Sequence, residues 1–171
     1  MARPNRRDSE FTEYVQARTP WLRRIAYLLC QDWHRADDLT QAAFLKLYLN
    51  WDRARKAAHF DAYVRTILVR TFLNEQRTTW WARMSLRESG IPETGSAGFS
   101  GGVDDMVDLS AALAGVPPRQ RAALVLRFYC DLSVIETAEL LGCSPGTVKS
   151  QTSRGLDTLR AAVGTHPVIQ S

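Results

Sequence analysis

Apolar residues recur at intervals of three and four along most of this 171-residue chain, a spacing that gathers them on one face of an α-helix. The pattern predicts helices over residues 11–30, 35–51, 60–77, 103–113 and 119–129. Pro20 lies within the first of these and either opens a second helix or kinks one long helix. Residues 1–9 are polar and basic and are predicted to be a disordered lead-in. The chain as a whole is therefore predicted to be all-α.

The C-terminal third of the chain predicts two short helices joined by a tight turn. Ser133 can cap the first helix, and Glu136 three residues later completes a capping box. Gly142 tolerates the left-handed backbone conformation that ends a helix sharply. Ser144 and Pro145 then supply the N-cap and the first residue of a second helix. Together these features predict a helix-turn-helix, in which the second helix lies in the major groove of DNA.

The direction of each side chain on this second helix follows from a rotation of about 100° per residue. Val148 faces inward toward the small Ala138, and Thr152, Gly155 and Leu159 share its face. The side chains of the opposite face and its edge are small, polar or basic, which suits contacts with base edges and phosphates. We therefore predict DNA contacts from Thr147, Lys149, Ser150, Ser153 and Arg154. An ordinary solvated face is the alternative, but the agreement of caps, glycine turn and small-residue contact favours DNA.

Two groups of basic and polar residues in the N-terminal half could hold a nucleic-acid strand. The first lies in the short connection over residues 52–59, where Ala57 and Ala58 leave room for a base. The second forms a stripe along the helix that follows. The candidates are Arg53, Arg55, Lys56, Arg70, Asn74 and Arg77. A plain solvated surface is the alternative for both groups. Trp80 and Trp81 either complete the apolar core of this half or stack on bases.

Two adjacent carboxylates, Asp37 and Asp38, could indicate a metal site or an acid–base pair. Neighbouring residues of a helix diverge by about 100°, however, so these carboxylates do not converge on one ion. No His or Glu follows at i+3 or i+4 to complete a ligand set. We predict no metal and no cofactor, and instead an acidic surface for a basic partner, formed by Asp37, Asp38 and Gln41.

The formal net charge is only +4, but it is unevenly distributed along the chain. Residues 1–80 carry 14 basic and 9 acidic residues, residues 81–112 carry 2 and 5, and residues 113–171 carry 6 and 4. Two basic ends separated by an acidic middle indicate two nucleic-acid-facing modules. The middle is also rich in Gly, Ser and Pro, a composition typical of a flexible linker. We therefore predict two small helical domains, 10–81 and 104–165, joined by a linker over 82–103.

The three cysteines, Cys30, Cys130 and Cys143, lack the spacing of a metal-ligand set and cannot all pair with one another. We expect them to be small buried side chains in a reducing compartment. No apolar run approaches the length of a membrane span, and the N-terminus lacks the apolar core of a signal peptide. The chain is therefore expected to act in the cytoplasm.

Three stretches of the chain resemble the sigma factors of bacterial RNA polymerase. RADDLTQAAFLKLY is similar to region 2.2, and FDAYVRTILVRTFLNEQR is similar to regions 2.3 and 2.4. The stretch from PPRQR to LDTLR resembles the sigma-4 domain almost throughout. The family indicated is the small extracytoplasmic-function type, which has only sigma-2 and sigma-4 domains. Gln151 and Thr152 replace the family's usual Arg-Leu pair, as in an actinobacterial SigE-type subgroup, and Pro145 stands where that subgroup has a branched apolar residue.

The resemblance implies a non-enzymatic role in promoter-specific transcription initiation, with core RNA polymerase and promoter DNA as partners. Asp37, Asp38 and Gln41 would dock on the β′ clamp coiled coil, and the β flap would be a further polymerase contact. The connection Arg53–Ala58 and the helix Tyr63–Arg77 would capture the −10 element, and the second helix of the helix-turn-helix would read the −35 element. The family also leaves room for an anti-sigma factor.

Two other classes of function stay open on the residues alone. A stand-alone helix-turn-helix regulator would bind an operator without polymerase, usually as a dimer on a palindrome. A small helical enzyme acting on nucleic acid would need a convergent acid, base or metal set. The three histidines, His34, His59 and His166, are scattered without partners along the sequence. The resemblance favours a sigma factor over both alternatives.

Overall fold

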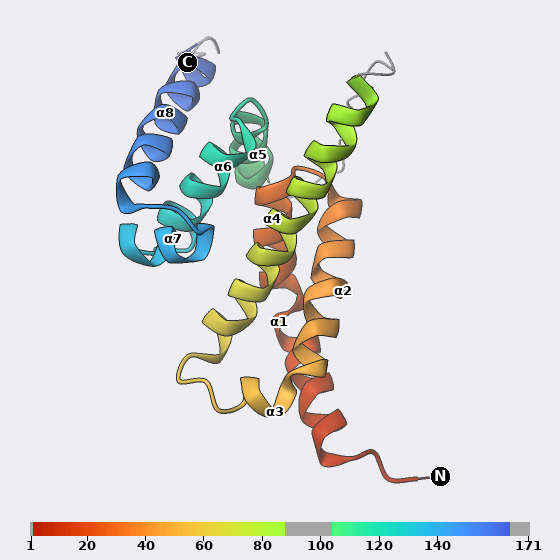
Figure 1. The fold of residues 1–171 in the computed structure, drawn as a ribbon. Coiled ribbons are helices and arrows are strands. Elements are labelled where there is room, and N and C mark those ends of the chain that lie inside the picture. Colours follow the sequence, from red (N-terminus) through yellow and green to blue (C-terminus); the bar gives the residue numbers. More distant parts are fainter. Residues whose placement is uncertain (1, 88–103, 165–171) are drawn as a thin grey trace. The chain divides into compact units, whose positions relative to one another are not determined.

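The computed structural model describes the backbone of residues 2–87 and 104–164, and the side chains of 2–78 and 109–162 (Figure 1). All regular secondary structure in these ranges is helical, which confirms the predicted all-α class. The chain divides into two units, the first being Met1–Tyr27 with Asp32–Ser96 and the second Leu28–Gln31 with Ala97–Ser171. None of the described helices is long and apolar enough to cross a membrane.

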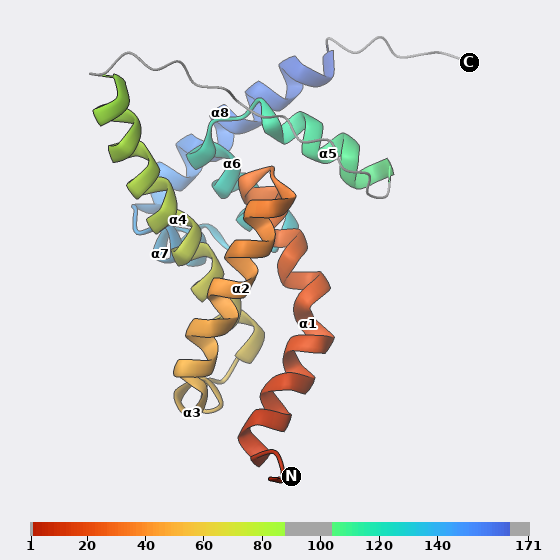
Figure 2. The ribbon, with the colours of Figure 1, turned by 90° about the vertical axis from the view of Figure 1, so that its right-hand side faces the viewer.

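The first unit is built on three long helices and one short one: α1 (Arg6–Cys30), α2 (Trp33–Leu49), α3 (Trp51–Ala54) and α4 (Phe60–Arg87). Helices α2 and α4 pack side by side, and α1 lies alongside α2 (Figure 2). The apolar stripes that the sequence predicts meet between these helices. The buried side chains include Leu22, Ile25, Leu39, Leu47, Val64, Leu68 and Phe72.

Several boundaries in the first unit differ from the sequence-based expectation. Residues 6–9 are helical and not a disordered lead-in, and α1 continues through Pro20 as a single helix. Helix α2 begins at Trp33 because Asp32 caps it, accepting hydrogen bonds from the backbone N–H of His34 and Arg35. Helix α4 continues past the predicted end at Arg77 to Arg87.

The second unit contains α5 (Asp104–Ala114), α6 (Pro118–Leu124), a π-helix (Val125–Tyr129), α7 (Val134–Leu141) and α8 (Pro145–Gly164). The sequence predicts one continuous helix over 119–129, packed through Ala122, Leu126 and Tyr129. Ala122 and Leu126 are indeed fully buried, but Tyr129 is 40% exposed. The wider π-helical turn changes the rotation per residue at this point, so the periodicity of an α-helix misplaces the last side chain.

The helix-turn-helix has the local structure that the sequence predicts. Both hydrogen bonds of the capping box between Ser133 and Glu136 are present, at 3.0 and 2.7 Å. Gly142 ends α7 with a φ of 67°, in the left-handed region. The hydroxyl of Ser144 accepts a hydrogen bond from the backbone N–H of Thr147 at 3.1 Å, and Pro145 is the first residue of α8. These caps fix where α7 ends and where α8 begins.

Helix α8 crosses α6 at a close contact that only glycine permits. A Cβ atom at Gly155 would lie 2.8 Å from Cδ1 and 3.0 Å from Cγ of Leu124, whose side chain is buried. Real Cβ atoms essentially never lie within 3.0 Å of another heavy atom, so a larger side chain would require the Leu124 side chain or one of the two helices to shift. Gly155 therefore sets the distance between α6 and α8.

Gly155→Ala should lower the free energy of unfolding by about 1–3 kcal/mol, because the added methyl group overpacks the buried contact with Leu124. Gly146→Ala is the matched control within α8, since the nearest atom to its Cβ would be the Ser144 hydroxyl oxygen at 3.8 Å. This control should be neutral or stabilising by up to about 1 kcal/mol. Urea denaturation of both variants measures the difference, and equal effects would contradict the close helix contact.

Candidate nucleic-acid interface

The outer face of α8 carries the side chains that the sequence predicts for DNA contact. Val148 is fully buried, and Gly155, two turns further on the same face, is buried as well, which fixes the rotation of the helix. Four predicted side chains are exposed on the face away from the core: Lys149, Ser150, Ser153 and Arg154. The fifth, Thr147, is half-buried at the edge, with its hydroxyl oxygen 2.9 Å from that of Ser144. This arrangement leaves hydroxyl groups and cations exposed on the face that the sequence predicts for the major groove.

The three cations in the connection over residues 52–59 differ in their surroundings in the structure. Arg53 and Lys56 are exposed, and neither forms an ion pair with a described residue. The guanidinium of Arg55 instead lies 3.5 Å from the carboxylate of Glu10 in α1. Arg55 is therefore partly neutralised, a contact that the sequence does not reveal because Glu10 lies far away along the chain.

An aromatic cluster packs at both ends of this connection, in α3 and at the start of α4. Rings from α1, α3 and the start of α4 gather around the buried Trp51, with Phe11 and Phe60 edge to face against it and Tyr14 tilted beside it. The adjacent Asp61 accepts hydrogen bonds from the Tyr14 hydroxyl, at 2.8 Å, and from the Arg18 guanidinium. Burial and the hydrogen bond to Asp61 raise the pKa of Tyr14 well above its usual value. The connection thus begins and ends on fixed supports.

The predicted polar stripe on α4 is exposed as expected. Arg70, Asn74 and Arg77 all face away from the core of the first unit. At about 1.5 Å per residue, Arg70 lies roughly 15 Å and Arg77 roughly 25 Å along the helix from Phe60. A strand that touches both the connection and this stripe must therefore run along α4. Trp80 and Trp81 lie in α4, but their side chains fall outside the described residues.

The predicted acidic surface on α2 is divided by an ion pair. Asp37 binds the guanidinium of Arg23, which also lies 4.2 Å from the ring centroid of Trp33. Asp38 diverges from Asp37 by about 100° and is exposed, and Gln41, one turn after Asp37, is exposed as well. The sequence overlooks Leu45 and Leu49, which are 61% and 69% exposed and continue the Asp38 and Gln41 stripe. The exposed surface on α2 therefore has a polar and an apolar half.

Metal chemistry gains no support from the described residues, among which no group of three His, Cys, Asp or Glu side chains could hold an ion. Cys30, Cys130 and Cys143 form no disulfide with one another. Cys30 is buried, as predicted, whereas Cys130 and Cys143 are only half-buried.

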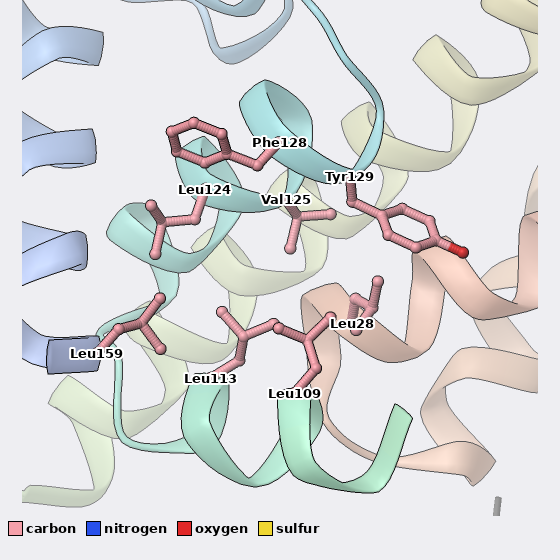
Figure 3. A pocket seen from close by; sticks show the side chains of 8 residues that line it. All are labelled: Leu28, Leu109, Leu113, Leu124, Val125, Phe128, Tyr129 and Leu159. Atoms are coloured by element: carbon pink, nitrogen blue, oxygen red, sulfur yellow. The ribbon is translucent and has the colours of Figure 1, made fainter. Parts of the chain in front are cut away.

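An apolar pocket of about 180 Å³ lies in the second unit (Figure 3). The side chains around it come mainly from α5, α6, the π-helix and α8, and they include Leu109, Leu113, Leu124 and Leu159. Phe128 and Tyr129 of the π-helix also line it and are 60% and 40% exposed. Large exposed aromatic side chains beside an apolar hollow are typical of a surface that another protein covers.

The fold and its exposed polar faces define a two-part, all-helical DNA-binding protein with a helix-turn-helix. The family model for Sigma-70 region 2 matches residues 14–82, and the model for Sigma-70, region 4 matches residues 106–159. The chain belongs to the sigma-70 family of RNA polymerase sigma factors, as its resemblance to the extracytoplasmic-function type predicts.

Known relatives agree with this assignment. The RNA polymerase sigma-E factor of Streptomyces avermitilis is 36% identical over 154 residues, which cover 88% of this chain and 83% of the relative. The sigma-E factor of Streptomyces coelicolor is also 36% identical, covering 88% and 84%. Among solved structures, the sigma factor RpoE of Bartonella quintana, in complex with the anti-sigma factor NepR, matches with a TM-score of 0.70 and 26% identity. That match covers 91% of this chain and 98% of RpoE.

Asp61→Asn should lower the free energy of unfolding by about 1 kcal/mol, because it removes the negative charge of the carboxylate that accepts hydrogen bonds from Arg18 and Tyr14. Asp38→Asn makes the same chemical change at an exposed position without an ion pair to a described residue, and it should leave stability unchanged. Thermal unfolding of the two variants tests this, and an unaffected Asp61→Asn variant would argue against the network as a support.

Proposed function

We propose that this chain directs RNA polymerase to promoters by dividing the work between its two units. The first unit docks on core polymerase and captures the −10 element, and the second unit reads the −35 element. The observation that carries the proposal is the exposed polar face of α8, held outward by the buried Val148 in a chain of the sigma-70 family. Thr147, Lys149, Ser150, Ser153 and Arg154 are the proposed −35 contacts.

Docking on polymerase is assigned to the exposed surface of α2. Asp38 supplies a carboxylate without an ion pair to any described residue, and Gln41 supplies a neighbouring amide; both suit the basic β′ clamp coiled coil that the family resemblance implies. Asp37 serves instead as the partner that orients Arg23. Leu45 and Leu49 add an apolar area to the same stripe. Interfaces of this kind combine an apolar centre with a polar edge.

The −10 element is assigned to the connection and the stripe of α4. Arg53 and Lys56 are free to meet phosphates of the non-template strand, and Ala57 and Ala58 leave space for an unpaired base. Arg55 contributes less in this proposal because Glu10 already neutralises part of its charge. Arg70, Asn74 and Arg77 extend the same track along α4.

The apolar pocket of Figure 3 is the proposed contact for the β flap of polymerase. Support comes from the exposed Phe128 and Tyr129, since an apolar helix or loop placed there would remove both rings from water. The similar RpoE is known in a complex with an anti-sigma factor, so an anti-sigma factor is a further proposed partner for this chain. The chain is proposed to act in the cytoplasm, without catalysing a reaction of its own.

Transcription in vitro with core polymerase on fragmented genomic DNA, followed by mapping of the 5′ ends, tests the proposed function. Specific initiation that requires the chain is the expected result. The stand-alone regulator would instead bind an operator tightly without polymerase, and gel shifts with and without the core enzyme separate the two.

Arg154→Ala should weaken promoter binding by the holoenzyme by about 1–3 kcal/mol if the side chain reads a base. Val148→Ala is the companion variant, because it changes the buried face of the same helix. It should reduce the free energy of unfolding by roughly 1–3 kcal/mol through a small cavity. Filter binding and urea denaturation distinguish the two effects. Normal binding and transcription by Arg154→Ala would mean that the DNA-facing side of α8 is misassigned.

Asp38→Arg should weaken retention of core polymerase at least about tenfold, because it places a cation against a basic partner. Glu139→Arg makes the same charge change at an exposed position on α7 and should leave retention intact. Pull-down of core polymerase by each full-length variant provides the measurement. Wild-type retention by Asp38→Arg would remove α2 as the docking surface.

A further inference from the structure

The first turns of α1 lie beside α3 and the end of α2 in the first unit (Figures 1 and 2). Arg7 donates a hydrogen bond to the carbonyl of Tyr48 at 2.7 Å, and its guanidinium lies 3.7 Å from the carboxylate of Asp52. Phe11 packs edge to face against both Tyr48 and Trp51. These contacts hold the start of the connection in place without engaging any of its cations.

A further residue of α1, Glu10, does engage a cation of the connection. One oxygen of its carboxylate accepts a hydrogen bond from Nε of Arg6 at 3.0 Å, and the other lies 3.5 Å from Nη2 of Arg55. Carboxylates and phosphates offer oxygen atoms to the same guanidinium donors, so the two anions can replace each other beside an arginine. Glu10 therefore occupies a position that a phosphate of a nucleic-acid strand could take.

The ion pair between Glu10 and Arg55 is weak enough to be exchanged. The side chain of Arg55 is 48% exposed and that of Glu10 is 32% exposed, so water and salt screen their attraction. The backbone of Arg55 is held separately, because its N–H donates a hydrogen bond to the carbonyl of Trp51 at 2.9 Å. The guanidinium group can therefore leave Glu10 while the backbone of the connection keeps its conformation.

We propose that Glu10 masks Arg55, so that a nucleic-acid strand must displace this carboxylate to bind the cation. The inference rests on the proposed function, which places the non-template strand on the connection. A strand held only by phosphate contacts exchanges one anion for another at Arg55 and gains little attraction there. A strand that also fits the space beside Ala57 and Ala58 still binds, because the additional contacts offset the exchange. Glu10 is thus a specificity-determining residue that acts through Arg55 and lowers the affinity for strands of any sequence.

The test measures the affinity of the full-length chain for a random-sequence single-stranded oligonucleotide by fluorescence anisotropy between about 50 and 200 mM salt. Glu10→Gln should tighten binding about two- to fivefold at the lowest salt, the range for the loss of one half-exposed ion pair. It should also steepen the slope of log affinity against log salt concentration by up to about 0.7, the value for one more neutralised phosphate of a single strand. Glu13→Gln is the matched control at an exposed position of α1, without an ion pair to a described residue, and it should retain the wild-type affinity and slope.

Dependence on Arg55 separates masking from a general effect of charge. In a chain that carries Arg55→Gln, the added Glu10→Gln change should steepen the slope far less, since only the highly exposed Arg6 remains beside it. Equal steepening in both backgrounds, equal slopes for Glu10→Gln and Glu13→Gln, weaker binding by Glu10→Gln, or no binding by any variant would overturn the proposal. These measurements use no polymerase. A chain that shows the expected slopes but fails to initiate transcription would overturn the proposed function alone, and normal initiation beside equal slopes would overturn the masking alone.

Discussion

The buried face of α8 is the constraint on which the DNA-binding unit depends. Val148 is fully enclosed, and Gly155 lets α6 approach so closely that a methyl group would collide with Leu124. Two fixed points about two turns apart leave the helix no freedom to rotate about its axis. The same packing that stabilises the unit therefore also determines which side chains are exposed on α8. In the proposed function, stability and recognition use opposite faces of this one helix.

In the first unit, ion pairs between helices decide which charges are available to a partner. Arg23 forms an ion pair with Asp37, Glu10 forms one with Arg55, and Asp61 accepts hydrogen bonds from both Arg18 and Tyr14. Each pair links side chains that are far apart along the chain. The charges that remain, such as Asp38 on α2 and Arg53 in the connection, are those without such a partner among the described residues. Fewer charged side chains are therefore available to a partner than the composition indicates.

Local signals predict the helix-turn-helix well, because its caps and its glycine turn involve residues within a few positions of one another. The capping box of Ser133 and Glu136 and the left-handed Gly142 are both present as predicted. Features that depend on tertiary packing or on a departure from the α-helical period could not be predicted from the sequence. The pairing of Arg55 with Glu10 depends on how α1 packs, and the π-helix that exposes Tyr129 departs from the α-helical period. The continuation of α4 beyond Arg77 to Arg87 was likewise not predicted, because no capping residue or helix breaker in the sequence marks where this helix ends.

The distribution of charge also bears on why such a chain would need a partner. Sequence-independent affinity for DNA grows with the number of phosphates that cations neutralise. The chain has 22 basic residues but a net charge of only +4, and several of its arginines are engaged by its own carboxylates. The cations left on α8 and α4 are few and stand on separate units. Each unit alone would therefore hold DNA weakly at physiological salt. Joining both units to one polymerase would make their contacts additive on a single promoter, because the second contact becomes intramolecular once the first has formed. Weak separate contacts then favour promoter recognition by the assembly over DNA binding by the free factor.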